Sequence, residues 1–597
     1  MINVTKASGN QLWLEMTKYA DVFVDRIREV PIADRSYCPM NHSWMIKADY
    51  LPGLVEKIGR YNFSSEDPSI MRIITPPEDE EDRAAKTKER LKNIALIRDM
   101  DFKTYPMPHQ IEGFNYAIAK PKLLIADMPG LGKSKTAIDA AVWRKSRNLI
   151  SKCLIVCCVN STKYNWQKEI QIHSDEKSVI FDQSTAEKKL KAIQEWKYSD
   201  ELFGIINIES IRPKELDKNK VFRCISGYIS PANLPMNPLL EALNQIADMV
   251  IVDEIHKCKT PNSKQGIALR QLTPAYRLGL SGTPMTNKAD DLWNIMRWLN
   301  CYNDGFWTFR KEFCIMGGYE DKEIAGYKDL DRLHKILDSC MLRRKKDEVL
   351  DLPPKLFHSE YIELSKKEKK RYREAREGII KKITDNTGRI EAVTSQNALT
   401  TILKLREVTD GLDIDTGLPV EEEDNSKLLR VKEMLNEEII PNGKKALIFT
   451  CWETIADMYR KHLQDLQPAY IVGKVSPADR QKEVERFQND PNCKVAIGTI
   501  GAMGTGLTLT AASYVIFVDK DWNDTENEQA EDRAYRIGTE DSVVIISMIA
   551  KNTIDERVED ALAEKRALFS QIVDNTSNVV KKKKTDIGYL LGYNQEE

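Results

Sequence analysis

The chain has 597 residues, more than the roughly 250 to 300 at which a single hydrophobic core stops growing, so we expect several domains. Apolar residues make up 42% and charged residues 30%, which excludes a disordered chain. The formal charge of −2 excludes a protein that is basic throughout, so any nucleic-acid surface must be a local patch.

Two further properties of the composition indicate an intracellular location. The 11 cysteines form no Cys-x-x-Cys pair, which favours reduced thiols over a zinc knuckle. The residues from Met1 to Lys6 lack a signal-peptide pattern, and no stretch reaches the roughly 20 apolar residues of a membrane helix. We expect no membrane segment and a cytoplasmic protein, at the nucleoid or a viral replication site, or in the nucleus of a eukaryote.

An acidic linker ends the first part of the chain. Residues 75–82 combine two prolines with five acidic residues, a composition that cannot bury apolar surface. We therefore predict a small N-terminal α+β domain over residues 1–80. The basic run Lys581 to Lys584 lies in a predicted tail, 576–597, where a nucleic-acid contact, a nuclear address and a solvated segment stay open.

Short β-branched runs followed by helical segments fill the two large parts of the chain, a pattern typical of buried parallel strands with crossover helices. The predicted strands of residues 88–345 and of residues 426–575 are Leu123–Ile125, Leu154–Val156, Ile205–Ile206 and Val250–Val252, then Leu447–Phe449, Val495–Ile497, Val515–Val518 and Val543–Ile546. The sequence therefore predicts an α/β protein with two parallel-sheet domains, joined by a helical connector over 346–425.

A glycine-rich segment follows the first predicted strand and precedes a helix. Glycine N–H groups can surround a phosphate, a lysine can reach the outer phosphates, and a hydroxyl can ligate magnesium. The predicted ATP-binding residues here are Pro129, Gly130, Leu131, Gly132, Lys133 and Ser134. Asp127 stands where the Gly-x-x-x-x-Gly-Lys-Ser/Thr pattern has its first glycine, and an ordinary glycine-rich turn stays an alternative.

An acidic pair follows the strand Val250–Val252. Asp253 is suited to holding magnesium through water, and Glu254 to polarising an attacking water. Such a pair alone could be a solvated turn. Together with Lys133 it predicts an ATPase whose cofactors are ATP and Mg²⁺, the metal being held by Ser134 and Asp253.

The Asp-Glu-Ile-His segment at 253–256 resembles the DExH motif of superfamily 2 helicases. The chain from about Tyr105 to Glu556 resembles one branch of these, the Swi/Snf-type DNA translocases. The resemblance implies two RecA-like lobes with a nucleotide cleft between them. It also implies that Gln110 reads adenine, that Gly504 and Gly506 contribute to ATP binding, and that a coupling set links the ATP site to DNA. The coupling residues are His256, Ser281, Thr283 and Gln529.

The same resemblance assigns residues that contact the DNA backbone. Hydroxyl, amide and amino groups at strand ends and helix starts hold phosphates without distinguishing bases. The assigned residues are Asn160, Ser161, Thr162, Lys163, Thr450, Thr499, Thr508 and Trp522. For the basic run Arg343 to Lys346 the sequence leaves phosphate contact and simple solvation open.

Two arginines complete the predicted catalytic set. Arg533 and Arg536 are three residues apart, so on a helix they would share one face. The resemblance makes them arginine fingers that reach the γ-phosphate across the cleft, a role suited to a charged, bidentate guanidinium.

The first function that we expect is an ATP-driven translocase on duplex DNA that remodels branched DNA by annealing, fork reversal or branch migration. The order of apolar and aromatic residues from Val22 to Leu54 resembles the HARP-type domain of annealing helicases, although a generic interaction domain stays an alternative. Displacement of DNA-bound protein and a non-translocating ATP-dependent switch are the other functions. We expect duplex or branched DNA as partner, a single-strand-binding or replication protein as a further one, and a monomer.

Overall fold

The computed structural model divides into two compact units. Unit 1 comprises Met1–Val349 with Ala567–Lys582, and unit 2 comprises Leu350–Arg566 with Lys583–Glu597. The residues that the structure describes are 2–7, 10–16, 21–38, 43–58, 63–65, 67, 70, 101–160, 162–317, 323–350, 352–353, 355–383, 395–503, 507–536, 539 and 541–574. The predicted acidic linker and basic tail lie outside them.

Unit 1 is built on a seven-stranded sheet whose strands all run parallel. In spatial order they are β14 (Met341–Leu342), β6 (Lys122–Ile125), β11 (Tyr276–Leu280), β10 (Met249–Asp253), β7 (Cys153–Cys157), β9 (Phe203–Asn207) and β8 (Ser178–Ile180). The four strands predicted from β-branched runs in residues 88–345 are confirmed as β6, β7, β9 and β10.

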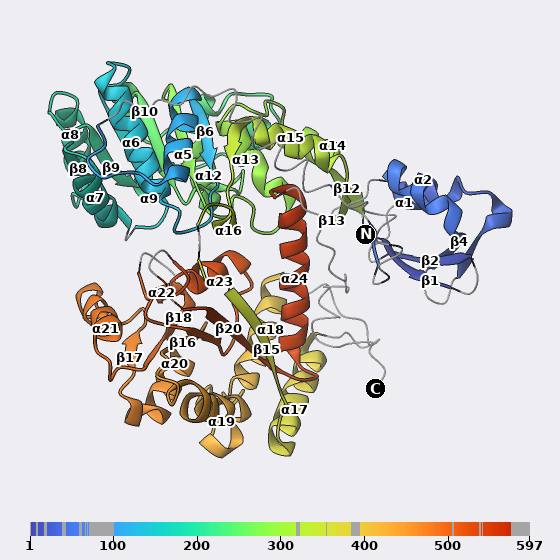
Figure 1. The fold of residues 1–597 in the computed structure, drawn as a ribbon. Coiled ribbons are helices and arrows are strands. Elements are labelled where there is room, and N and C mark those ends of the chain that lie inside the picture. Colours follow the sequence, from blue (N-terminus) through green and yellow to red (C-terminus); the bar gives the residue numbers. More distant parts are fainter. Residues whose placement is uncertain are drawn as a thin grey trace. The chain divides into compact units, whose positions relative to one another are not determined.

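Helices cover both faces of this sheet (Figure 1). The α-helices described between residues 101 and 349 are α5 (Pro108–Ala119), α6 (Lys133–Ser146), α7 (Thr162–His173), α8 (Ala186–Trp196), α9 (Ile208–Ile211), α10 (Lys218–Ile225), α11 (Pro238–Ile246), α12 (Lys264–Gln271), α13 (Trp293–Trp298), α14 (Phe306–Phe313), α15 (Leu330–Cys340) and α16 (Lys346–Val349). Successive side chains of a strand point to opposite faces, so Val250 lies in one core and Ile251 in the other. A strand buried on both faces is apolar throughout, which is why the runs were visible in the sequence.

The N-terminal part of unit 1 has its own five-stranded sheet, in the order β3 (Arg35–Cys38), β4 (Ser43–Lys47), β2 (Gln11–Met16), β1 (Ile2–Lys6), β5 (Phe63–Ser64). Helices α1 (Asp21–Arg28) and α2 (Leu51–Ile58) accompany it, so the predicted α+β class is confirmed. Its core also contains Ile315 and Ala325, from the antiparallel hairpin of β12 (Cys314–Gly317) and β13 (Glu323–Tyr327). The N-terminal core is therefore completed by a segment more than 200 residues along the chain.

Unit 2 contains a second all-parallel sheet of six strands. Their order is β15 (Lys355–Ile362), β20 (Val543–Ala550), β19 (Tyr514–Phe517), β16 (Ala446–Thr450), β18 (Val495–Thr499) and β17 (Ala469–Ile471). The four runs predicted in 426–575 are confirmed as β16, β18, β19 and β20. The predicted connector, 346–425, contains β15, so this part of it is an edge strand of the second sheet and not helical.

Some helices of unit 2 pack on the two faces of the sheet, and others share a separate apolar cluster. They are α17 (Lys366–Ile383), α18 (Ser395–Thr409), α19 (Ser426–Glu433), α20 (Glu453–His462), α21 (Pro477–Asn489), α22 (Ile500–Met503), α23 (Asp524–Glu531) and α24 (Ile554–Ile572). Helix α24 begins in unit 2, and its residues from Ala567 onward belong to unit 1. Among the described residues, no helix combines the length and the apolar character needed to cross a membrane.

Candidate nucleotide-binding and hydrolysis site

The predicted phosphate and metal motifs of unit 1 lie at one edge of its sheet. Strands β6, β11, β10 and β7 are neighbours, and all four are parallel, so their carboxyl ends meet at the same edge. The glycine-rich segment follows β6, Ser281 follows β11, Asp253 ends β10, and Asn160 lies just beyond β7. Topology thus gathers four motifs that are spread over more than 150 residues of sequence.

The glycine-rich segment is a tight turn between β6 and α6. Gly132 has a φ of 80° and precedes Lys133, the first residue of α6. A Cβ at Gly132 would overlap Nε2 of Gln110, so the position excludes side chains by both backbone angle and space. The segment therefore leads directly into a helix N-terminus, where backbone N–H groups and the helix dipole favour a phosphate.

The Lys133 ammonium group points back into the turn. It donates to the carbonyl oxygens of Asp127 at 2.8 Å and Met128 at 3.3 Å. Burial lowers the pKa of Lys133, while the nearby carboxylates of Glu254, Asp127 and Asp253 oppose this shift. A polyphosphate ligand would stabilise the charged lysine further.

Asp253 and Glu254 lie at the carboxyl end of β10. An Asp253 oxygen accepts a hydrogen bond from Nε1 of Trp166 at 2.9 Å, which fixes the carboxylate. Burial and the neighbouring Glu254 raise the pKa of Asp253 to about 6. Glu254 has a φ of 50°, in the left-handed region that side chains disfavour, and such strain is concentrated at functional sites.

A chain of buried polar groups leads away from Glu254. Nδ1 of His256 lies 3.2 Å from a Glu254 carboxylate oxygen and 2.9 Å from the Ser281 hydroxyl oxygen. That hydroxyl oxygen accepts a hydrogen bond from the Thr283 N–H at 3.1 Å. Burial opposes ionisation of Glu254, but the hydrogen bond and charge of His256, together with Lys133, leave its pKa lowered.

The loop after β11 also contacts the glycine-rich segment. A Cβ at Gly282 would come within 2.8 Å of Pro129, so only glycine allows this approach. Three of the predicted coupling residues, His256, Ser281 and Thr283, are therefore brought together between the acidic pair and the phosphate loop. Sequence spacing alone does not show this contact.

For Arg344 the sequence left phosphate contact and simple solvation open. In this structure Arg344 is buried and contacts other groups of the protein. Its side chain is 5% exposed, and it bonds Asp127 twice, Nε to Oδ1 at 3.1 Å and Nη2 to Oδ2 at 2.5 Å. It also contacts Glu112 at 3.3 Å and donates to the His109 carbonyl oxygen. The aspartate in place of the first glycine thus has a buried counter-charge. The sequence signal for this ion pair was Asp127, because a buried carboxylate requires a cation.

Arg343 also faces inward. It donates to the carbonyl oxygens of Ala126 and Gly282, each at 2.7 Å, and its Nε donates to Asp574 at 3.0 Å. The backbone from 342 to 344 bonds the phosphate loop as well, because Ala126 N–H donates to Leu342 and Met128 N–H to Arg344. Arg343 and Arg344 therefore hold the loop in place, a role that sequence reasoning missed.

Gln110, predicted to contact adenine, is 8% exposed. Its Nε2 donates to the Leu131 carbonyl oxygen at 3.4 Å, and its Oε1 accepts from the Met107 N–H at 3.0 Å. Both ends of the amide are thus bonded within the protein, and adenine recognition stays a proposal.

The two predicted arginine fingers do not lie on a helix, and the prediction of a shared helix face is wrong. Helix α23 ends at Glu531, and Arg533 and Arg536 lie in the turns that follow. Arg533 donates to the Leu507 carbonyl oxygen at 3.2 Å, and Arg536 to the Thr508 hydroxyl at 3.1 Å. The turns after the helix are held by further bonds: the Arg533 carbonyl accepts from Leu509 N–H, and the Thr539 hydroxyl lies within hydrogen-bond distance of the carbonyls of Ala534 and Arg536.

The predicted DNA contacts divide into exposed and buried positions. Asn160 and Thr508 are exposed, and Thr162 begins α7 half-buried. Lys163, Thr450 and Thr499 are 7%, 0% and 8% exposed, which departs from the expectation that they touch DNA directly. Thr450 and Thr499 end the inner strands β16 and β18, which are covered on both faces, and Lys163 lies in the first turn of α7. Gln529 is also buried, while Ser161, Gly504 and Gly506 lie outside the described residues.

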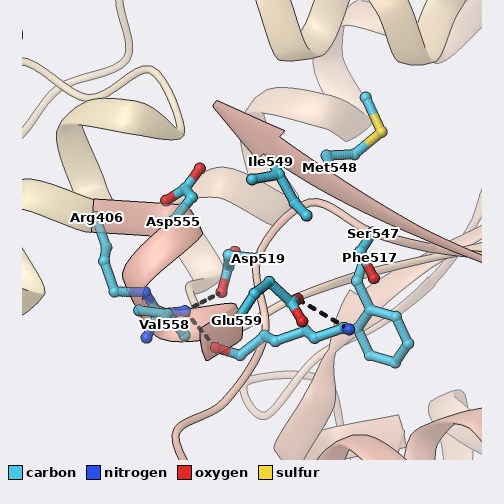
Figure 2. Close-up of a pocket in the computed structure, with 10 residues that line it drawn as sticks. Arg406, Phe517, Asp519, Ser547, Met548, Ile549, Asp555, Val558 and Glu559 are labelled. Atoms are coloured by element: carbon cyan, nitrogen blue, oxygen red, sulfur yellow. Dashed lines mark hydrogen bonds and ion pairs between the residues drawn. The ribbon is translucent and has the colours of Figure 1, made fainter. Parts of the chain in front are cut away.

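Thr450 instead belongs to a buried polar network of unit 2, part of which lines a small cavity (Figure 2). Its hydroxyl donates to Asp519 at 2.6 Å, and Arg406 lies 3.4 Å from the same carboxylate. The Arg406 guanidinium also lies 5.7 Å from the ring centre of the half-buried Trp522. These contacts connect Thr450, at the end of β16, to Asp519 in the loop after β19.

The donors near the phosphate loop suit a magnesium ion that arrives with a nucleotide. Within the described ranges, no group of three or more His, Cys, Asp or Glu residues converges on a metal position. Mg²⁺ commonly keeps several waters and takes one or two protein ligands plus phosphate oxygens. The hydroxyl of Ser134 and the carboxylate of Asp253 meet that need.

Comparison with known families decides which ATPases these motifs resemble. Residues 50–413 match the SNF2-related domain, and residues 427–538 match the helicase conserved C-terminal domain. The chain belongs to the SNF2-related family of ATP-dependent helicases. The resemblance to Swi/Snf-type proteins, based on motif order, is thereby confirmed.

Relatives within the family have names that describe different functions. The chain is 29% identical over 80% of its length to the human DNA annealing helicase and endonuclease ZRANB3, and 26% identical over 80% to the ISWI chromatin-remodeling complex ATPase ISW1 of Saccharomyces cerevisiae. It spans 41% of the length of each. The SWI2/SNF2 ATPase core of Sulfolobus solfataricus in complex with dsDNA is 25% identical, covering 81% of this chain and 96% of that one, with a TM-score of 0.35.

Proposed function

We propose that this protein is a DNA-dependent ATPase that translocates on duplex DNA and remodels branched DNA. One observation supports the proposal that the protein hydrolyses ATP. In this member of the SNF2-related family, Lys133, Asp253 and Glu254 lie together at one edge of the sheet. Glu254 at the same edge also contacts His256, which contacts Ser281.

In this proposal, each group at the edge has one task. The N–H groups at the start of α6 and the Lys133 ammonium bind the phosphates, and Ser134 with Asp253 hold Mg²⁺. Glu254 orients and deprotonates the attacking water, for which its lowered pKa keeps it ionised. Arg533 and Arg536 supply positive charge to the γ-phosphate during transfer.

The His256–Ser281–Thr283 chain is proposed to link hydrolysis to DNA. It joins Glu254 to the loop after β11, and Gly282 in that loop packs on Pro129. A change at the phosphate loop therefore alters the packing of a neighbouring loop. Asn160 and Thr162, after β7, are proposed to contact backbone phosphates at the same sheet edge.

Branched DNA is proposed as the substrate because of two features together. The chain is similar to a relative named as a DNA annealing helicase, and it carries a separate α+β domain at its N-terminal end. A second candidate, displacement of DNA-bound protein, is favoured by the similarity to the ATPase of a chromatin-remodeling complex.

The deciding experiment measures ATP hydrolysis with linear duplex, forked and four-way DNA, linear single strands and RNA. We expect the highest rates with forked and four-way DNA and little stimulation by RNA. Lys133→Ala serves as the control without hydrolysis. Equal rates with and without nucleic acid would remove the translocase proposal, and equal rates on linear and branched duplex would leave protein displacement as the better candidate.

A test of the N-terminal domain must take into account that its core includes residues from elsewhere in unit 1. Deletion of residues 1–80 would expose Ile315 and Ala325, which complete its core. The truncated chain should therefore also carry Ile315→Ser and Ala325→Ser. We expect it to lose fork remodelling and to keep DNA-stimulated hydrolysis, whereas full remodelling activity would contradict the assignment.

A further inference from the structure

Three exposed aromatic side chains gather on unit 1, on helices that take no part in the nucleotide site. Phe222 on α10 is 55% exposed, Trp307 on α14 is 48% exposed, and Tyr228 just after α10 is 76% exposed. The rings of Phe222 and Trp307 have centroids 6.4 Å apart and are tilted by 44°. We call these three residues the aromatic patch.

The patch is held by a packed scaffold. The inner face of α10 contributes Val221, Cys224 and Ile225 to a small buried cluster. The turn after α10 approaches α14 so closely that a Cβ at Gly305 would lie 2.6 Å from the Ser226 carbonyl oxygen. The rings are therefore presented outward from a fixed surface, although burying them would be favourable by the hydrophobic effect.

The surroundings of the patch are basic, although the whole chain has a formal charge of −2. Residues 212–223 contain five basic and two acidic side chains. One of the acidic residues, Asp217, caps α10 by accepting from the N–H groups of Asn219 and Lys220. Among the described residues, no ion-pair partner lies within 4.0 Å of Lys218, Lys220 or Arg223, so their charges face solvent.

On each of the two helices, one basic residue shares a face with a ring of the patch. Lys218 and Phe222 are four residues apart on α10, and Trp307 and Lys311 are four apart on α14, so each pair shares a helix face. The guanidinium of Arg310, which pairs with Asp290 at 3.3 Å and is largely buried, lies 5.7 Å from the Trp307 ring centre. Exposed rings bordered by cations are the combination that binds single strands, since every base has a face to stack and every nucleotide a phosphate.

We propose that the aromatic patch binds single-stranded nucleic acid, with unpaired bases stacked on Phe222 and Trp307 and phosphates near Lys218, Lys220 and Arg223. Bases in a duplex are already stacked, so the rings select unpaired strands. The choice of DNA as the strand rests on the proposed function, in which remodelling a fork leaves bases unpaired. A second copy of the chain fits less well, because a symmetric contact would bring the same basic side chains together.

The test measures binding of fluorescent oligothymidine and oligouridine of about 20 nucleotides to the full chain without ATP. We compare the wild type with Phe222→Ala, Trp307→Ala and the double variant. The dissociation constant for oligothymidine should rise about 5- to 100-fold for each ring removed. Tyr198→Ala is the matched control, since Tyr198 is 84% exposed on the same unit and lies 5.5 Å from a lysine, Lys197, but is not part of the patch.

A second set of variants tests the charges. Changing Lys218, Lys220 and Arg223 to glutamine should weaken binding and flatten its dependence on salt, since fewer counterions are released. Quenching of Trp307 fluorescence on addition of oligothymidine, absent in Trp307→Ala, should accompany binding. Because the rings are exposed, all variants should keep the wild-type melting temperature.

Unchanged oligothymidine binding in the double variant would overturn the proposal. A patch-dependent change in sedimentation without a change in DNA binding would overturn it as well, in favour of self-association. Patch-dependent binding of oligouridine alone would overturn the assignment to DNA. Hydrolysis stimulated by linear duplex should stay at the wild-type level in the double variant, so failure of the motor proposal and failure of the patch proposal remain distinguishable.

Discussion

At the scale of single residues, Glu254 combines backbone strain with a defined set of partners. Its φ of 50° lies in a region that costs a residue with a side chain roughly 1 to 2 kcal/mol. The contact with His256 at 3.2 Å fixes the carboxylate that this backbone projects. Strain maintained by surrounding contacts indicates a side chain whose direction matters for function.

Glu254→Gln should bind ATP but hydrolyse it at least about 100-fold more slowly, because glutamine keeps the shape and cannot accept the proton of water. The measurement is the turnover number with saturating DNA, together with nucleotide binding by fluorescence. Glu195→Gln is the control, since the Glu195 side chain is 67% exposed and lies on α8. A wild-type rate in Glu254→Gln would show that another group is the base.

Asp127 and Arg344 form the second residue-scale feature, a buried ion pair behind the phosphate loop. Asp127→Asn leaves the arginine without its closest counter-charge, and only Glu112 at 3.3 Å compensates in part. We expect about 3 kcal/mol of lost stability, seen as a lower unfolding temperature, and a raised KM for ATP.

The exposed pair Lys177–Asp200 is the control for this prediction. Its atoms are 2.9 Å apart, but its side chains are 67% and 82% exposed, so Asp200→Asn should leave the unfolding temperature close to that of the wild type. If Asp127→Asn and Asp200→Asn had equal, small effects, the buried pair would not be what holds the loop.

At the scale of elements, buried charges join the helices of unit 2 to its sheet. Lys427 on α19 is fully buried between Asp410 at 2.8 Å and Asp555 at 2.7 Å, and it donates to the Val518 carbonyl oxygen. Burial opposes the charged form of Lys427, but the adjacent carboxylates of Asp410 and Asp555 raise the pKa of Lys427 above its usual value. One lysine of α19 thus joins the residues that directly follow α18 and β19 to the first turn of α24.

Lys427→Met should destabilise unit 2 by about 3 to 5 kcal/mol, because two buried carboxylates lose their cation. Calorimetry should show a transition at lower temperature. Lys482→Met is the control in the same unit, where the Lys482 side chain is 76% exposed. An unchanged transition in Lys427→Met would mean that the carboxylates are neutral or hydrated in the folded protein.

At the scale of the whole molecule, the predicted hydrolytic groups are divided between the two units. Lys133, Asp253 and Glu254 belong to unit 1, and Arg533 and Arg536 belong to unit 2. Nucleotide binding and hydrolysis should therefore be separable by substitution.

Arg533→Ala and Arg536→Ala should each keep ATP binding and reduce hydrolysis by about 1,000-fold or more, the usual contribution of an arginine finger. Fluorescent-nucleotide binding and steady-state hydrolysis measure the two effects. Arg373→Ala on α17 is the control, at an exposed position of the same unit. Parallel loss of binding and hydrolysis would instead indicate a role in folding of unit 2.

The class of the fold and the order of the motifs could be predicted from the sequence. Eight apolar runs became parallel strands, since a strand buried on both faces is apolar at every position. The phosphate loop and the acidic pair were equally visible, because each is a short segment whose chemistry depends on adjacent residues.

Which side chains lie at the candidate nucleotide site, and which are buried behind it, could not be predicted from the sequence and is seen in the tertiary structure. Arg344 pairs with Asp127 across 217 residues, and Trp166 bonds Asp253 across 87. Likewise, Leu509 and Thr539 bond the turns that contain Arg533 and Arg536, and the sheet buries Thr450. These outcomes depend on partners distant in sequence, because burial and counter-charge are properties of the packed chain and not of any local pattern.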